Sequence, residues 1–355
     1  MLIYLLDGRE VCCGEDDLWY LSQKDKYVKI LVTGGTGFLG RRLVSALLDR
    51  GHQVYMMGRN FSRVQELMQD GAIPVACDLR EREAVFAACA GMNTVYHVAA
   101  LVKPWGDWTD FFEINVEGTA TVLEGCRRHN IRRCIYVSTS GVTFNGQNQH
   151  NITESAPYPS RFSSPYTRSK YQAEKLVQAA SDVPTVIIRP HVIFGPGDRW
   201  LPRMLEHARQ QRLYQIGNGR NRSDVTYVDN VVHALLLALY AQNICGKTYI
   251  ITNDEHIVLW NALRVILQRL KLSESLHTLP LPFALMAASA MERRASWIGN
   301  TPMLTRYTAT MLACTQTYDI SAARKDLAYE PVVSVSEGID RTLDSLKLHR
   351  RWTIY

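Results

Sequence analysis

The sequence predicts an α/β fold in which a doubly wound parallel sheet is followed by a smaller, mostly helical part. From Val28 to Pro190, short apolar segments alternate with amphipathic ones, as strands and crossover helices do. The apolar segments contain few polar positions, which is typical of strands buried on both faces of a sheet. After Pro190 this alternation stops, and helical periodicity dominates.

The expected elements follow in order from Val28. Segments rich in β-branched and apolar residues predict strands at 28–33, 53–58, 73–79, 93–100, 133–139 and 184–190. An amphipathic helix is expected from a glycine-rich turn to Arg50, and further helices at 61–69, 81–90, 108–129 and 165–180. Beyond the last strand, helices are expected near 200–211, 229–241, 258–270 and 280–297. They should pack on the carboxyl ends of the strands.

Composition and charge exclude several classes of protein. The 355 residues carry a net charge of +6, but the basic residues form no concentrated stripe, so a nucleic-acid partner is not expected. The eight cysteines contain no Cys-x-x-Cys pair, so no metal site is expected, and free thiols fit a cytoplasmic protein. No apolar stretch is long enough to span a membrane. Residues 279–291 could lie on a membrane surface or cover an apolar pocket, and the pocket is favoured.

Three glycines predict a phosphate-binding turn. Gly34, Gly37 and Gly40 follow the first strand and open the first helix. Glycine allows the tight turn and the close approach of a pyrophosphate, and the helix N-terminus offers free N–H groups. Within this turn, further cofactor contacts are expected from Thr36, Phe38 and Leu39. The fold is therefore expected to be of the Rossmann type.

The end of the second strand favours NADP(H), with NAD(H) as the alternative. Gly58 stands where an acid often binds the adenine ribose, and Arg59 follows it. An arginine can bind a 2′-phosphate through a forked contact, whereas an acid would repel it. Arg41, after the third glycine, could assist in binding this phosphate.

Three regions of the chain are expected from these patterns. They are an N-terminal extension at 1–27, a dinucleotide-binding domain at 28–189 and a substrate-binding region at 190–355, with an interleaved boundary.

Several motifs in order resemble the extended short-chain dehydrogenase/reductase family. They are GGTGFLG, CDL at 77–79, HVAA at 97–100, INVEGT at 114–119, VST at 137–139, PYTRSK at 165–170 and RPHVIFGPGD at 189–198. The resemblance implies catalysis by Tyr166, Lys170 and a hydroxyl group, for which Thr139 is preferred and Ser140 is the alternate. It also implies cofactor contacts from a further set of residues: Asp78, Leu79, Ala99, Ala100, Asn115, Lys170 and Pro190.

The chemistry explains why a tyrosine and a lysine would stand four residues apart. A proton donor must lie close to the oxygen of a ketone that receives hydride. A free tyrosine has a pKa near 10, and a neighbouring ammonium is expected to lower that pKa by favouring the phenolate. Lys170 is also expected to bind the nicotinamide ribose, and Thr139 to hold the substrate oxygen.

At two places the sequence departs from the motifs of sugar-modifying enzymes in this family, and this narrows the choice of branch. Ser140-Gly141 replaces the Asp-Glu pair of sugar dehydratases, and Ser223 stands where sugar-nucleotide enzymes usually place an arginine. The remainder resembles 3β-hydroxysteroid dehydrogenases and bacterial 2-alkyl-3-oxoalkanoate reductases, with Trp105, Trp108 and His191 as expected substrate contacts.

The sequence therefore predicts an NADP(H)-dependent oxidoreductase that interconverts an apolar, lipid-like ketone and its secondary alcohol. The ketone would be a β-keto acid or a sterol-like molecule. The alternatives are a sugar-nucleotide epimerase or reductase and a non-catalytic NADP-binding regulator. A homodimer is expected, with the helices at 108–129 and 165–180 in its contact, and peripheral membrane contact stays open.

Overall fold

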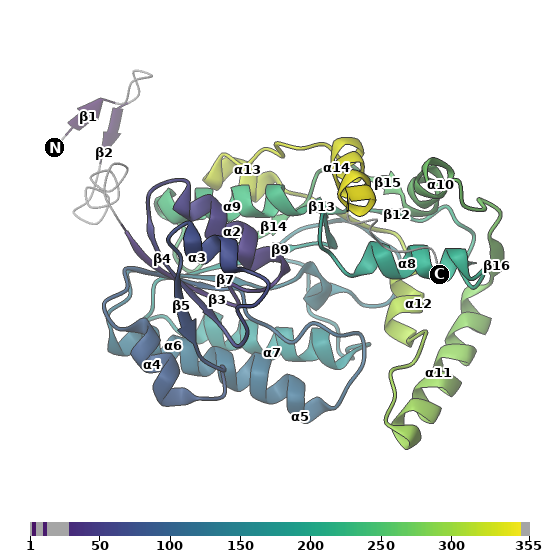
Figure 1. The fold of residues 1–355 in the computed structure, drawn as a ribbon, viewed down its shortest axis with the longest axis horizontal. Coiled ribbons are helices and arrows are strands. Elements are labelled where there is room, and N and C mark those ends of the chain that lie inside the picture. Colours follow the sequence, from purple (N-terminus) through teal and green to yellow (C-terminus); the bar gives the residue numbers. More distant parts are fainter. Residues whose placement is uncertain (1, 5–9, 13–27, 349–355) are drawn as a thin grey trace.

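A seven-stranded parallel sheet forms the centre of the molecule in the computed structural model, which describes residues 2–4, 10–12 and 28–348 (Figure 1). Its strand order is β14-β9-β7-β6-β3-β4-β5, and every neighbouring pair is parallel. This is the doubly wound α/β fold that the alternating segments predict. The strands are β3 (Lys29–Thr33), β4 (Gln53–Gly58), β5 (Ile73–Ala76), β6 (Thr94–His97), β7 (Arg133–Val137), β9 (Thr185–Pro190) and β14 (Thr248–Ile251).

Helices cover both faces of the sheet (Figure 1). One face carries α2 (Phe38–Leu48), α3 (Gln65–Gln69), α9 (Val228–Tyr240) and α13 (Ser321–Leu327). The other carries α4 (Arg82–Cys89), α5 (Trp108–Phe111), α6 (Gly118–Arg128) and α7 (Pro165–Ala179). Because both faces are covered, the strands other than the edge strand β5 are mostly buried, as their apolar composition requires.

The helix expected over 108–129 contains an irregular segment. Residues Phe112–Glu117 form a π-helical stretch between α5 and α6. Such wide turns are uncommon and often occur at functional sites. This one places Asn115 at the edge of the site described below.

The chain returns to the central sheet after residue 190. Strand β14 pairs with β9 at the sheet edge, and α9 packs against α2 on the same face. The substrate side and the dinucleotide side are therefore interwoven in sequence.

The remaining part is mostly helical but also contains short strands. Its helices are α8 (Trp200–Arg209), α10 (Leu259–Arg269), α11 (Leu281–Ile298), α12 (Arg306–Ala313) and α14 (Val335–Leu348). The 3-10 helix Ser140–Thr143 follows β7. One small mixed sheet has the order β15-β12-β17-β8, and two parallel pairs are β10-β13 and β11-β16. These strands are β8 (Gln149–Ile152), β10 (Ile193–Phe194), β11 (Tyr214–Ile216), β12 (Arg222–Ser223), β13 (Thr226–Tyr227), β15 (Ile257–Val258), β16 (His277–Leu279) and β17 (Gln316–Tyr318).

At the N-terminus, β1 (Leu2–Tyr4) pairs antiparallel with β2 (Glu10–Cys12). The rest of the expected extension at 1–27 lies outside the described residues. Within the part of the chain that the structure describes, no helix has the length and apolar character needed to cross a bilayer.

Helix α11 projects from the body of the molecule (Figure 1) and carries exposed apolar side chains. Phe283, Met286 and Trp297 are 61%, 68% and 91% exposed. Their spacing places them near one face of the helix. The inner face, with Ala284 and Ala288, packs against the body, so α11 is amphipathic with an apolar outer stripe.

Candidate active site

The predicted site residues gather at one edge of the central sheet. Since all seven strands are parallel, their carboxyl ends share that edge. The glycine turn follows β3, Arg59 follows β4, Asp78 follows β5, and Ala99 follows β6. Thr139 and Ser140 follow β7, and Pro190 ends β9. The parallel topology thereby brings residues that are far apart in the sequence to the same edge of the sheet.

The glycine turn is shaped so that side chains cannot be added. Gly34 has φ +68°, and a Cβ atom there would lie 2.7 Å from the Ala99 Cα. A Cβ atom on Gly40 would lie 2.1 Å from the carbonyl oxygen of Gly34. Gly37 precedes α2, whose first N–H groups therefore face the turn. This bare backbone at a helix N-terminus fits a dinucleotide pyrophosphate.

The adenosine end of the site has no acid after β4. A Cβ atom on Gly58 would lie 2.6 Å from the Thr36 side chain, so Thr36 occupies the space that an acid at this position would need. Arg59 is 70% exposed at its side chain, and its Nη1 lies 3.4 Å from the Asp78 carboxylate. Arg80 binds the same carboxylate through two bonds, of 2.9 and 3.0 Å. These bonds lower the pKa of Asp78 to about 2, which keeps it ionised.

Other residues expected to hold the cofactor line the same edge. Phe38 and Leu39 form the first turn of α2, and Leu39 is buried. Leu79 is buried against Gly118, where a Cβ atom would lie 3.0 Å from it. The Ala99 amide donates to the Thr33 hydroxyl at 3.2 Å, which fixes the start of the loop that contains Ala100.

Arg41 points elsewhere than toward Arg59. Its Nη2 donates to the Pro196 carbonyl at 3.4 Å, and the neighbouring Arg42 donates to the same oxygen at 3.2 Å. The two arginines therefore connect α2 to the loop after β10. In that loop, Asp198 accepts hydrogen bonds from the Trp200 and Leu201 amides and caps α8.

Thr139, Tyr166 and Lys170 come together as the family motif predicts. Thr139 follows β7 and caps the next 3-10 helix, where its hydroxyl accepts from the Gly141 amide at 3.2 Å. Tyr166 stands in the first turn of α7 and hydrogen-bonds the Thr139 hydroxyl. One turn later, Lys170 is buried, and its Nζ donates to the Val137 carbonyl at 2.7 Å.

The electrostatics of this group differ from the expectation. Burial raises the pKa of Tyr166 to about 12, although the hydrogen bond with Thr139 opposes the shift. Burial also lowers the pKa of Lys170 to about 7, while the Glu174 carboxylate acts in the opposite direction. The predicted lowering of the Tyr166 pKa by Lys170 is therefore wrong: burial raises this pKa, and the group that opposes the shift is Thr139, not Lys170. Tyr166 is held as a neutral phenol, which suits a proton donor.

Ser140 and His191 form a separate, buried pair beside Thr139. The Ser140 hydroxyl and His191 Nδ1 are 2.6 Å apart, and His191 Nε2 lies 3.5 Å from the Ser223 hydroxyl. His191 is only 2% exposed, and burial lowers its pKa to about 3, so the ring is neutral. Its ring packs against Tyr318. His191 therefore links Ser140 to Tyr318 in the buried packing next to Thr139.

Asn115 joins three segments at the π-helical turn. Its Oδ1 accepts from the Leu101 amide at 2.7 Å, and its Nδ2 donates to the Leu101 carbonyl at 3.1 Å. The same Nδ2 donates to the Ser169 hydroxyl at 2.9 Å, one residue before Lys170. Asn115 thus fixes both the loop after β6 and the helix that carries Tyr166 and Lys170.

The two tryptophans expected at the substrate mouth are only partly buried. Trp108 begins α5, and its ring lies under the guanidinium of Arg168 at 4.1 Å and beside Phe112. These contacts are those of a packed surface residue. Trp105 lies in the preceding loop, three residues away.

Sequence reasoning missed a buried ion pair beneath Lys170. Glu174, one helical turn beyond Lys170, and Arg189 in β9 are 0% and 2% exposed at their side chains. Arg189 Nε lies 3.2 Å from both carboxylate oxygens, and the hydroxyls of Ser138 and Tyr158 also donate to Glu174. A carboxylate four residues after the lysine on a helix was the available signal.

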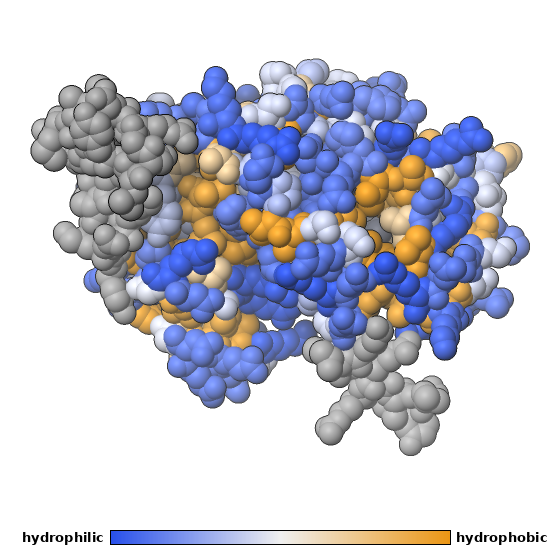
Figure 2. Space-filling model, turned by 90° about the horizontal axis from the view of Figure 1, so that it is seen from above, coloured by the Kyte–Doolittle hydropathy of each residue, from blue (hydrophilic) through white to orange (hydrophobic). Residues whose placement is uncertain are grey.

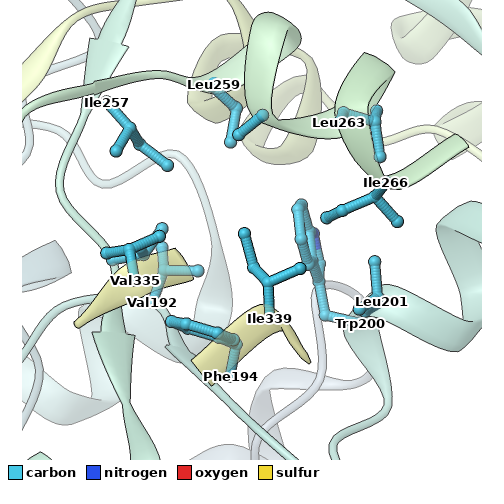
Figure 3. Close-up of a pocket in the computed structure, with 12 residues that line it drawn as sticks. Val192, Phe194, Trp200, Leu201, Ile257, Leu259, Leu263, Ile266, Val335 and Ile339 are labelled. Carbon is cyan, nitrogen blue, oxygen red and sulfur yellow. The ribbon is translucent and has the colours of Figure 1, made fainter. Parts of the chain in front are cut away.

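An apolar pocket lies between α8, α10 and α14 (Figure 3). Its cavity volume is about 40 Å³, and every residue that lines it is apolar. Val192 lines one wall and directly follows His191, while Ile339 and Leu263 face it from α14 and α10. Helix α11 contributes no lining residue, so this is not the apolar pocket that residues 279–291 were expected to cover. In the surface view, apolar side chains emerge among polar ones over this end of the molecule (Figure 2).

Comparison with known proteins agrees with this site. The 3-beta hydroxysteroid dehydrogenase/isomerase family matches residues 31–282. A 2-alkyl-3-oxoalkanoate reductase of Stenotrophomonas maltophilia (strain K279a) is 37% identical over 329 residues, which cover 88% of this chain and 98% of that protein. A decarboxylating sterol-4-alpha-carboxylate 3-dehydrogenase of Mus musculus is 32% identical over 338 residues, covering 90% and 91%.

Solved structures support the fold. The UDP-glucuronic acid 4-epimerase from Bacillus cereus in complex with NAD superposes with a TM-score of 0.72 at 24% identity, covering 90% of this chain and 99% of that one. The family match and the curated relatives confirm the resemblance to extended short-chain dehydrogenases/reductases. The chain belongs to the 3-beta hydroxysteroid dehydrogenase/isomerase family and is an NAD(P)-dependent oxidoreductase of that group.

Proposed function

We propose that the chain is an NADP(H)-dependent reductase of an apolar β-oxo acid, which it converts to the corresponding β-hydroxy acid. The observation that carries this proposal is the Tyr166 hydroxyl, bonded to Thr139 at the edge of the sheet where the glycine turn lies. Lys170 stands one helical turn away. The two residues provide a proton donor and an oxygen-binding hydroxyl in one place.

The names of the relatives suggest that the substrate carries a carboxylate near its ketone. A 2-alkyl-3-oxoalkanoate has its ketone two carbons from a carboxylate, and a sterol-4-carboxylate has the same relation to the carbon at position 3. A β-oxo or β-hydroxy acid unit is thus common to the two substrate classes. The apolar pocket that begins beside His191 supports an apolar remainder, since burial of each CH₂ contributes about 0.8 kcal/mol.

In the proposed reaction, Thr139 and Tyr166 hold the ketone oxygen. When bound, the nicotinamide supplies hydride for reduction. Tyr166 donates its proton to the oxygen as negative charge develops there, and its raised pKa keeps the proton in place until that moment. The Lys170 ammonium, whose pKa lies near 7, can then return a proton to the Tyr166 phenolate oxygen. The neutral phenol supports the reducing direction.

NADP(H) is proposed over NAD(H) because of the residues after β4. Thr36 fills the space beside Gly58, and no carboxylate extends from that position to repel a 2′-phosphate. Arg59 is exposed beside it and can bind such a group. Asp78, the nearby acid, is already bound by Arg80.

The test is NADPH oxidation with a long-chain β-oxo acid by the native protein and by Tyr166→Phe. We expect the variant to lose at least about a hundredfold in kcat, the usual contribution of a positioned proton donor. Tyr171→Phe, a change on the same helix, is the control and should retain activity. Equal rates for native protein and Tyr166→Phe would refute the assignment, and binding of NADPH without turnover would favour a regulator.

We further propose that the outer stripe of α11 rests on an anionic lipid surface. Phe283, Met286 and Trp297 offer apolar and aromatic contacts, and Arg293 and Arg294 stand exposed between them. Apolar and cationic side chains on one helix face suit the headgroup region of a membrane.

Two other expectations stay predictions. One is the homodimer with a contact through 108–129 and 165–180, and the other is the cytoplasmic location.

A further inference from the structure

A tyrosine from the C-terminal part reaches the catalytic hydroxyls. Tyr307 belongs to the first turn of α12, far in sequence from Thr139 and Tyr166. A Cβ atom added at Gly141 would lie 3.4 Å from the Tyr307 hydroxyl and 3.5 Å from the Thr139 hydroxyl. The Tyr307 hydroxyl is therefore close to the 3-10 helix that Thr139 caps. Gly141, which has no side chain, leaves the space between the two hydroxyls open.

The start of α12 is held on both sides of Tyr307. Thr305 and Thr308 form a capping box, with bonds of 3.1 Å from the Thr308 amide and 2.9 Å from the Thr305 amide. Glu292 of α11 accepts from the Arg306 amide at 2.8 Å and from its Nε at 2.7 Å. Since the backbone is fixed at residues 305, 306 and 308, the tyrosine is presented from a rigid base.

The Tyr307 hydroxyl has no hydrogen-bond partner among the residues that the structure describes. Burial raises its pKa well above the ordinary value, and the nearby Tyr166 and Tyr318 hydroxyls act in the same direction. It is therefore a neutral O–H donor at working pH. The Tyr307 side chain is half-buried, so this O–H can donate to a ligand at the site, which then supplies the missing acceptor.

We infer that Tyr307 donates a hydrogen bond to the carboxylate of the β-oxo acid while Thr139 and Tyr166 hold its ketone oxygen. The inference rests on the proposed function, because it assigns the second oxygen-bearing group of that same substrate. The two groups of a β-oxo acid are separated by a single carbon, so a hydroxyl beside the ketone site can reach the carboxylate. A phenol bonded to a carboxylate forms a charge-assisted bond, which is stronger than a neutral one.

The experiment compares two alcohols in the oxidative direction, with NADP⁺ in excess. 3-Hydroxydecanoate carries the carboxylate, and nonan-2-ol is the alcohol that remains when the carboxyl group is removed. For Tyr307→Phe, we expect KM for 3-hydroxydecanoate to rise about tenfold to thirtyfold with kcat changed less than about threefold. The kcat/KM for nonan-2-ol should stay within about twofold of native.

Tyr318→Phe is the matched control, because Tyr318 is a buried phenol of the same cluster that lies behind Ser140. It should not change the ratio of kcat/KM between the two alcohols. An equal loss on both alcohols in Tyr307→Phe, or no loss on either, would overturn the inference while leaving the proposed function standing. If the native protein oxidises neither alcohol, the proposed function and the inference fail together.

A second measurement uses the native protein alone, in case Tyr307→Phe folds poorly. The methyl ester of 3-hydroxydecanoate keeps the chain and the hydroxyl but has no negative charge. We expect the ester to show a KM about tenfold higher than the acid. Equal KM values for acid and ester would contradict a carboxylate contact.

Discussion

Replacing Lys170 by methionine should change how stability depends on pH. Lys170 is buried, and its pKa is about 7 in the fold against 10.5 in a free chain. Between these values the unfolded chain binds more protons than the fold, so the free energy of unfolding rises with pH. From pH 7 to pH 9 this group alone should contribute a rise of about 2 kcal/mol. Above pH 10.5 the lysine is deprotonated in both states, so it adds no further rise to the free energy of unfolding.

The assay is urea unfolding of the cofactor-free protein, followed by tryptophan fluorescence between pH 6.5 and 9.5. In Lys170→Met the rise is absent, so the variant gains most over native at low pH, and the difference shrinks as pH increases. The lost bond to Val137 costs the same at every pH and does not affect the slope. Lys175→Met, which removes an exposed lysine from the same helix, is the control. Parallel pH profiles for native protein and Lys170→Met would refute the burial argument.

Three further changes test other features. Glu174→Gln should lower the free energy of unfolding by about 3–5 kcal/mol in urea, because it leaves Arg189 buried without a counter-charge; Glu337→Gln, in an exposed pair, should cost under about 1 kcal/mol. Arg59→Ala should weaken NADPH binding about tenfold in a fluorescence titration and leave NADH binding unchanged; equal losses would exclude a 2′-phosphate contact. Trp297→Ala should reduce co-sedimentation with phosphatidylglycerol vesicles about tenfold, whereas undiminished binding would point to another surface.

The elements set by local pattern were predictable. The first six strands of the sheet and the glycine turn follow from composition and spacing, because burial on both faces leaves a continuous apolar run. Three of the six strands end two or three residues earlier than expected: the third at Ala76, the fourth at His97 and the fifth at Val137.

The elements set by distant contacts were not predictable from local pattern. Strand β14 has four residues and gains its place only by pairing with β9, more than fifty residues earlier. The π-helical turn depends on the bonds of Asn115 to Leu101 and Ser169. Likewise, the position of Tyr307 and the burial that raises the pKa of Tyr166 arise from packing between distant segments. The residue types of the candidate site could be named from the sequence, but their protonation could not.

The late pairing of β14 has a consequence for synthesis. As the chain leaves the ribosome, β9 emerges with one edge still unpaired, and it stays so until Ile251 is made. The nascent protein therefore passes through a stage with an open sheet edge, when a chaperone would bind most readily.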